Sequence, residues 1–262
     1  MRRNEQLDRR AFLGTVVASA VVGVSPGPVF AQKGIGERKI DPLELPLDKP
    51  GVWTLHFRYK PIRIVTLDGF GKDGKPQKQL VWYLWYQVYN LPPEGQTPEP
   101  VTCFPEFELV TKDTITPPLL DEPQPFLVSQ LNKIENPQDH PSLRLLTTIE
   151  ISKRPIPPSK RDAIPRVVTG VAVWTDMTEK APKTNKFSVY ISGLSNGQAT
   201  EELREGEKII KRKTLQINFV RPTDDTAPQA TDIRPDDTNA PAEQWIYRTS
   251  SIAKAIGRPK LP

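Results

Sequence analysis

The chain has 262 residues, with 36 lysines and arginines against 31 acidic residues and a formal net charge of +5. This mild charge does not suggest nucleic acid as a partner, because nucleic-acid-binding surfaces gather basic residues on one face. The single cysteine excludes an intramolecular disulfide and a cysteine-rich zinc site. The 29 prolines disfavour a helical protein, since proline interrupts helix interiors.

The first 31 residues have the three parts of a secretory signal peptide. Residues 1–10 contain four arginines, and an apolar run follows from Ala11 to Val24. Small residues lead to an expected cleavage point after Ala31. The alternative is an uncleaved anchor, but the run has 14 residues where a spanning helix needs about 20. No other apolar stretch reaches that length, so we expect no stable membrane span after cleavage.

The residues before the apolar run resemble the twin-arginine export motif. The family pattern prefers Ser or Thr where this chain has Asp8, and often Lys where it has Gly14. The resemblance implies a bacterial protein that is exported, with a periplasmic or otherwise extracytoplasmic location. Such an address is read by a receptor and is not itself an anchor. The positions that match the motif are Arg9, Arg10, Phe12 and Leu13.

Removal of the leader leaves 231 residues, enough to bury the core of one domain. The leader holds four arginines and two carboxylates, a net +2, so about +3 remains on the rest of the chain. Residues 32–50 contain two glycines and three prolines, and we predict an extended lead-in with little regular structure. One basic cluster, which we expect on the solvated part of a strand, comprises Lys208, Lys211, Arg212 and Lys213.

Residues 51–221 have the pattern of a β-sandwich. From Val52, apolar and aromatic side chains alternate with polar ones until Pro61 interrupts, and a second alternating run starts at Ile62. After a turn-like stretch, both alternate faces of residues 79–90 are apolar or aromatic, which predicts a central strand covered on both sides. Further strands are predicted at residues 107–111, 145–152, 167–175, 187–192 and 209–220.

The one helix candidate is Pro125–Glu135, where Leu127, Leu131 and Ile134 fall at i, i+4 and i+7. Residues 222–244 are rich in Pro, Asp, Thr and Ala, which predicts a mobile loop because such side chains offer little burial. A returning strand at 245–248 and a loosely held basic tail at 249–262 complete the chain. We therefore predict an all-β fold, a single β-sandwich-like domain of about eight or nine strands with at most one short helix.

Several strand segments resemble those of a family of uncharacterised exported bacterial proteins. The similarity covers roughly residues 50–250. It implies export and a β-rich body, and it implies no reaction, ligand or catalytic residue for this chain. The segments that carry it are Val81–Asn90, Gly170–Trp174, Phe187–Gly197 and Thr214–Phe219.

Histidine and cysteine are too scarce for most metal or covalent chemistry. The chain has only His56 and His140, so we expect no metal site and no cofactor. Cys103 with His140 as its base would require proximity imposed by the fold and a third orienting group. A small core residue is the preferred interpretation of Cys103.

Two further motifs could carry catalysis. Residues 193–197 have the form Gly-x-Ser-x-Gly of a nucleophile elbow around Ser195. An elbow needs a helix directly after its serine, whereas Asn196-Gly197 predicts a turn. Glu106 and Glu108 could act as the paired acids of a glycosidase, but spacing along a chain does not define the distance between two carboxylates. Solvated strand edges are the preferred interpretation of these acids.

The aromatic strand is the most informative feature of the sequence. Its second face carries Tyr83, Trp85 and Tyr89. An exposed face would offer a flat platform for a sugar ring or for the apolar patch of a partner. A covered face would be core, which we prefer because large aromatic side chains chiefly supply burial.

The sequence thus predicts an exported, non-enzymatic β-rich protein that binds or supports a component of the cell envelope. An envelope protein or a glycan is the expected partner. The alternative is an extracytoplasmic carbohydrate hydrolase that uses acidic residues such as Glu106 and Glu108. We identify no catalytic residue and lean against an enzyme.

Overall fold

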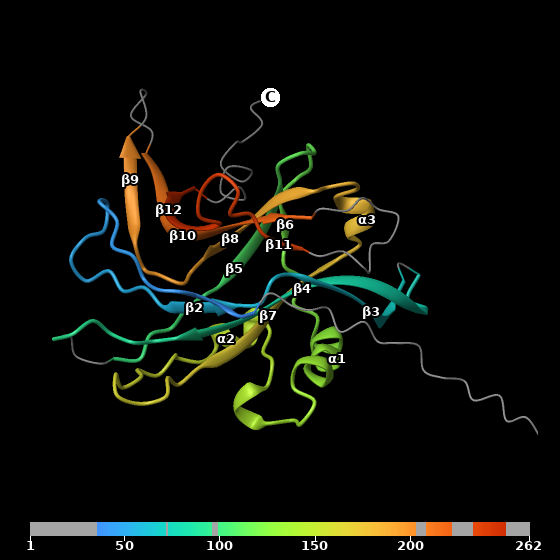
Figure 1. Ribbon diagram of the computed structural model, residues 1–262, viewed down its shortest axis with the longest axis horizontal. Coiled ribbons are helices and arrows are strands. Elements are labelled where there is room, and N and C mark those ends of the chain that lie inside the picture. Colours follow the sequence, from blue (N-terminus) through green and yellow to red (C-terminus); the bar gives the residue numbers. More distant parts are fainter. Residues whose placement is uncertain (1–35, 72, 96–98, 203–207, 222–232, 250–262) are drawn as a thin grey trace, which may run out of the picture. The chain divides into compact units, whose positions relative to one another are not determined.

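A computed structural model describes residues 36–71, 73–95, 99–202, 208–221 and 233–249. Residues 1–31, predicted as a signal peptide, and the tail beyond residue 249 lie outside the described residues. Strands dominate the described part, in two antiparallel sheets (Figure 1), so the all-β class is confirmed. Twelve strands are present among these residues, more than the eight or nine expected, together with three short α-helices where at most one was predicted.

The first sheet is built around the long strand β4 (Pro76–Tyr89). On one side, β4 pairs with β2 (His56–Tyr59) through its C-terminal part and with β3 (Arg63–Phe70) through its N-terminal part. The two shorter strands are therefore one arm of a long hairpin, interrupted around Pro61 as the sequence predicted. Proline has no N–H to donate to the pairing, which explains the break.

Two more strands complete this sheet, and one of them corrects a prediction. β7 (Val168–Thr175) pairs with the free side of β4, and β1 (Arg38–Ile40) pairs with β2. β1 lies within residues 32–50, where little regular structure was expected. It forms because Ile40 pairs with Phe57 and packs against the core, a partner that local composition does not reveal.

The second sheet is built around β10 (Lys208–Val220). The other strands of this sheet are β5 (Glu106–Thr111), β6 (Leu119–Leu120), β8 (Lys186–Ser192), β9 (Gln198–Glu202), β11 (Arg234–Pro235) and β12 (Glu243–Arg248). Along one side of β10, β9 pairs with its first half and β8 with its second half; along the other side, β12 and then β11 pair with it. β5 pairs with β8, and β6 with β5.

The main core lies between the two sheets. It contains the inward face of β4, and rings from the two sheets meet in it. The ring centroids of Tyr86 and Phe107 are 4.7 Å apart, and those of Trp82 and Phe187 are 5.6 Å apart. Each such side chain contributes roughly 1.5–3 kcal/mol by leaving water. This packing makes the fold a sandwich.

The opposite face of β4 is covered by α1 (Pro125–Glu135), the helix predicted with these bounds. Leu127 and Leu131 are buried against the sheet as expected, whereas Ile134 is exposed and Val128 is buried in its place. Figure 1 shows α1 on the side of the first sheet that faces away from β8 and β10. The prediction that the central strand is covered on both faces is therefore confirmed.

The predicted strand at residues 145–152 is wrong. Residues Thr148–Ser152 form the helix α2, because the Thr147 side chain accepts the backbone N–H of Glu150 and the Glu150 carboxylate accepts that of Thr147. This capping box satisfies the free amides of the first turn. Two other short helical elements of the described residues were not predicted, α3 (Met177–Lys180) and a 3₁₀ turn at Pro141–Leu143.

The segment 222–244, predicted as one mobile loop, is ordered where it is described. Residues 222–232 lie outside the described part of the chain. Beyond them, Ile233 and Ala242 are buried and β11 pairs with β10. The returning strand predicted at 245–248 is confirmed and begins two residues earlier. No helix within the described residues is both long and apolar enough to cross a membrane.

Candidate functional site

The three side chains proposed as an aromatic platform are buried. Tyr83, Trp85 and Tyr89 expose 2%, 6% and 1% of their surface. Tyr83 donates to a carboxylate oxygen of Glu135 on α1 at 2.8 Å, and Lys60 Nζ lies 4.4 Å from the Trp85 ring centroid. The strand therefore offers no exposed platform on this face, and the preferred core interpretation is confirmed.

The histidines and the cysteine lie in separate settings. His56 lies on β2, and its Nδ1 is 2.9 Å from Asp41 Oδ1. His140 lies in the loop after α1, and its Nδ1 is 2.8 Å from the Ser142 hydroxyl. Cys103 is 1% exposed within the main core, and burial raises the pKa of its thiol to about 11. Its interpretation as a core residue is confirmed. The described residues contain no group of three or more side chains placed to hold a metal ion.

Ser195 belongs to a turn and is fully engaged there. Its hydroxyl donates to the carbonyl oxygen of Trp53 at 2.6 Å and accepts from the Thr54 hydroxyl and the Gly197 amide, both at 3.1 Å. Strand β9, not a helix, follows the turn. The turn interpretation of this motif is confirmed, and no nucleophile elbow is present.

Glu106 and Glu108 lie on the same face of β5. Glu108 is buried, and the Arg248 guanidinium binds both of its oxygens. The same guanidinium lies 3.8 Å from the centroid of the Tyr190 ring. Glu108 is thus a buried, ion-paired carboxylate, and its interpretation as a solvated strand-edge acid is wrong.

A cleft of about 800 Å³, which was not predicted, lies beside the C-terminal end of β4 and the start of β2. One wall is the segment 41–54, which links β1 to β2. The other is made by residues that follow β4, 90–93 and 99–101, together with Arg161. These segments are distant in sequence and rich in proline, and no local motif connects them.

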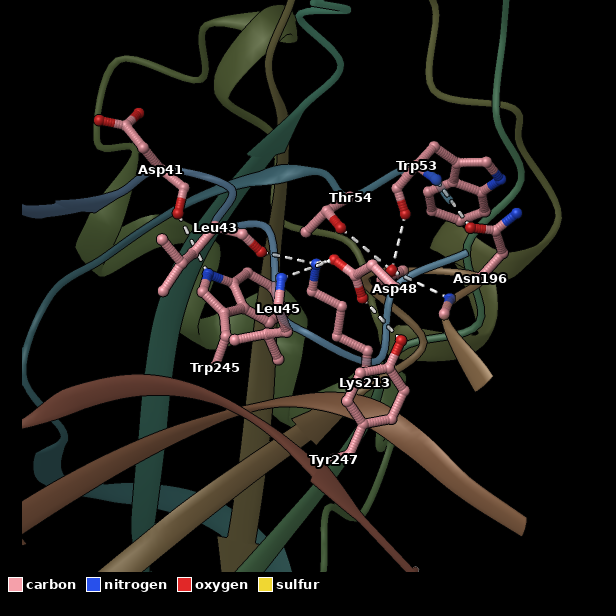
Figure 2. A network of polar contacts seen from close by, with 12 residues as sticks. Asp41, Leu43, Leu45, Asp48, Trp53, Thr54, Asn196, Lys213, Trp245 and Tyr247 are labelled. Carbon is pink, nitrogen blue, oxygen red and sulfur yellow. Dashed lines mark hydrogen bonds and ion pairs between the residues drawn. The ribbon is translucent and has the colours of Figure 1, made fainter. Parts of the chain in front are cut away.

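The wall 41–54 is held to the second sheet by one buried ion pair, which Figure 2 shows in close-up. Lys213 Nζ is 2.5 Å from Asp48 Oδ2 and donates to the Leu43 carbonyl oxygen at 2.6 Å. The Tyr247 hydroxyl donates to the other Asp48 oxygen at 2.6 Å. Lys213 is 2% exposed, so its predicted place on the solvated part of a strand is wrong.

The acidity of Asp48 reflects this setting. Burial opposes its ionisation, but hydrogen bonds from Lys213, Tyr247 and the Leu45 amide outweigh that effect and hold its pKa below the ordinary value. Asp48 is therefore a permanent anion at neutral pH. Its contacts with Lys213, Tyr247 and the Leu45 amide hold the middle of the segment 41–54 in place.

Trp53 lies near the C-terminal end of the same wall. Residues of the turn at 193–197 form hydrogen bonds with its backbone (Figure 2). Its amide donates to Asn196 Oδ1 at 2.8 Å, and its carbonyl accepts from Ser195. The Asn196 amide group also donates to the Gly51 carbonyl at 3.3 Å. These contacts hold the main chain at Trp53, and its half-buried side chain packs against the main core.

His56 also lines the cleft. It stacks on Tyr89 with ring centroids 4.8 Å apart, while Asp41 contacts both His56 and Lys39. Burial lowers the pKa of His56 below its ordinary value, and the hydrogen bond to Asp41 only partly offsets this. A neutral imidazole at this position packs against Tyr89 and supports the cleft floor.

Comparisons with protein-family models, with curated proteins and with solved structures found no match to this chain.

Proposed function

We propose that this chain is an exported protein of the bacterial cell envelope that binds an envelope component, a glycan or a protein, in the cleft beside Trp53. The observation that carries the proposal is the cleft, whose wall is held in place by the buried pair of Asp48 and Lys213. A site organised before binding loses little conformational entropy when its ligand arrives. Concave sites of this size commonly bind ligands.

Export is supported by the twin-arginine resemblance at Arg9 and Arg10, which lie outside the described residues. The test is a variant with both residues changed to lysine, followed by fractionation of the producing cells. We expect the variant to accumulate in the cytoplasm while wild type reaches the periplasm. Changing Arg2 and Arg3 in the same way is the matched control and leaves export intact. Equal export of all three proteins would contradict the twin-arginine route.

Binding is tested with protein recovered from the periplasm and immobilised against a native envelope extract. We expect a defined component to be retained by wild type and lost from a folded Trp53→Ala variant. Phe70→Ala is the matched control, because Phe70 is an exposed aromatic at the opposite end of the β3–β4 hairpin. Retention that is equal for all three proteins would remove the cleft from the binding site.

The alternative function, carbohydrate hydrolysis by Glu106 and Glu108, has weaker support. A glycosidase needs one carboxylic acid that can donate its proton and a second carboxylate placed across the scissile bond. Glu108 is neutralised by Arg248, and Glu106 lies beside it on one strand. Release of reducing ends from envelope glycans, with loss in Glu106→Gln, would reverse this preference.

A further inference from the structure

We infer that the ligand of the cleft is a neutral glycan of several sugar units, recognised by stacking on Trp53 and by hydrogen bonds from the cleft walls. This inference rests on the proposed function and names the ligand class of the same site. It follows from four properties of the lining: its volume, its charge balance, its lack of strand edges and its fixed indole.

The volume suits an oligomer rather than a single sugar. The cleft has about 800 Å³. Binding sites for small molecules usually have about 300–1,000 Å³, so this one lies near the upper end of that range. It runs between two loop walls and is open to solvent, which allows a chain to continue beyond it.

The charge of the lining is balanced. Asp48 and Lys213 neutralise each other. Asp41, a third acidic residue that lines the cleft and is exposed, pairs with Lys39 at 2.9 Å. The other exposed charged side chains of the lining are two of each sign: Glu44, Glu99, Lys49 and Arg161. Such a lining creates no net field to attract an anionic polymer or a basic peptide. Carboxylates accept hydrogen bonds and the basic groups donate them, which matches hydroxyl groups that do both.

The walls are poorly suited to an extended peptide. A peptide that adds to a sheet needs an edge strand with alternating N–H and C=O groups. Here the segments 41–54 and 90–93 lie outside the long strands, and four prolines of the lining have no N–H: Pro42, Pro50, Pro92 and Pro93. Their carbonyl groups can accept hydrogen bonds, as Pro92 does from Arg161 at 3.2 Å. A polyhydroxylated ligand can donate hydrogen bonds to such carbonyls.

Trp53 supplies the apolar part of recognition. The C–H face of a pyranose ring packs on a flat aromatic surface, and an indole is the largest that a protein offers. Ser195 and Asn196 hold the Trp53 main chain, and the half-buried side chain packs against the main core, so the residue is positioned before the ligand arrives. This arrangement gives the Gly193–Gly197 turn a role in binding.

The test measures binding of the exported protein by isothermal titration calorimetry. The neutral probes are chitotetraose, cellotetraose, maltotetraose and xylotetraose. An oligogalacturonate represents anionic glycans, and a proline-rich peptide represents protein ligands. We expect at least one neutral tetrasaccharide to bind saturably and the other two classes not to bind.

Two variants locate that binding. Trp53→Ala should weaken it about tenfold, equivalent to the loss of one aromatic contact. Arg161→Gln changes an exposed residue, so the variant should fold, and it should weaken glycan binding severalfold. This variant keeps the inference testable if Trp53→Ala unfolds. The matched controls Phe70→Ala and Arg154→Gln, both at exposed positions outside the cleft, should bind as wild type does.

The outcomes separate this inference from the proposed function. Binding of the peptide or the anionic glycan alone, with loss in Trp53→Ala, overturns the neutral-glycan inference and leaves the cleft as a binding site. A neutral glycan that binds equally to wild type, Trp53→Ala and Arg161→Gln overturns both. Absence of binding by every neutral probe, while the envelope extract still yields a Trp53-dependent component, overturns the glycan inference alone.

Discussion

Lys213 and Asp48 meet in a buried ion pair although 165 positions separate them in the chain. Lys213 comes from the middle of β10, and Asp48 from the loop wall of the cleft. Since Tyr247 occupies the second carboxylate oxygen, the pair also links the wall to β12. This ion pair thus both stabilises the sandwich and holds one wall of the cleft in position.

Asp48→Asn should destabilise the protein by about 3–5 kcal/mol, because it leaves the Lys213 ammonium buried without a counter-charge. Urea unfolding monitored by tryptophan fluorescence measures this difference. The double variant Asp48→Leu with Lys213→Met should lose less stability, since no charge is then left alone. A single variant as stable as wild type would contradict the view that this pair is tightly held.

Glu135 should make stability dependent on acid pH. Burial opposes its ionisation, but contacts with Lys60, Arg63 and Tyr83 outweigh that effect and hold its pKa below the ordinary value. The stability from this carboxylate is therefore complete above its unfolded pKa of about 4.3 and is lost as the pH falls through the lower folded value.

The variant Glu135→Gln tests this dependence. It should lose about 3 kcal/mol at neutral pH, and the difference from wild type should shrink as the pH falls below the unfolded value. Urea midpoints measured across this range check the prediction. Glu94→Gln, at an exposed loop residue, is the matched control and should follow wild type throughout. A constant difference at every pH would show that the ionisation of Glu135 is not responsible.

Gly193→Ala should be among the most damaging single changes, at about 3 kcal/mol or more. Gly193 has φ of +79°, and an added Cβ would overlap the carbonyl oxygen of Phe104. Gly51→Ala separates the two causes, because Gly51 has φ of +85° but open space around the added carbon. We expect about 1 kcal/mol for that control. Thermal unfolding of both variants measures the contrast, and equal losses would exclude the steric contribution.

Thr147→Ala should destabilise the protein by about 1 kcal/mol through loss of the α2 cap. The Thr147 hydroxyl accepts the Glu150 amide at 3.1 Å, so that amide becomes unpaired in the variant. Hydrogen exchange of the Glu150 amide should accelerate, while Thr102→Ala, at an exposed position, leaves it unchanged. Unaltered exchange in Thr147→Ala would mean that α2 is held by packing alone.

Cys103 should be inert in the native protein. Its thiol is buried, and its raised pKa leaves little of the reactive thiolate at neutral pH. Reaction with an aromatic disulfide reagent should be slow without denaturant and complete soon after urea is added. Rapid modification of native protein would place Cys103 near the surface instead.

Much of the fold could be predicted because its causes are local. Period-two alternation reports one buried face of a strand, and residues 79–90, apolar on both faces, reported a strand with two covered faces. The helix Pro125–Glu135 followed from its 3.6-residue period. The error at α2 also had a local signal, since Thr147 and Glu150 have the spacing of a capping box.

The candidate site depended on tertiary structure. The sequence by itself determined an all-β body, its central strand, its one long helix and the resemblance of its first residues to an export signal. It could not determine that Lys213 is buried beside Asp48, or that Trp53 and Arg161 line one cleft, because these contacts join loops far apart in the chain. Periodicity reports which face of a strand is buried; only the packing of the two sheets decides which distant loops meet at their ends.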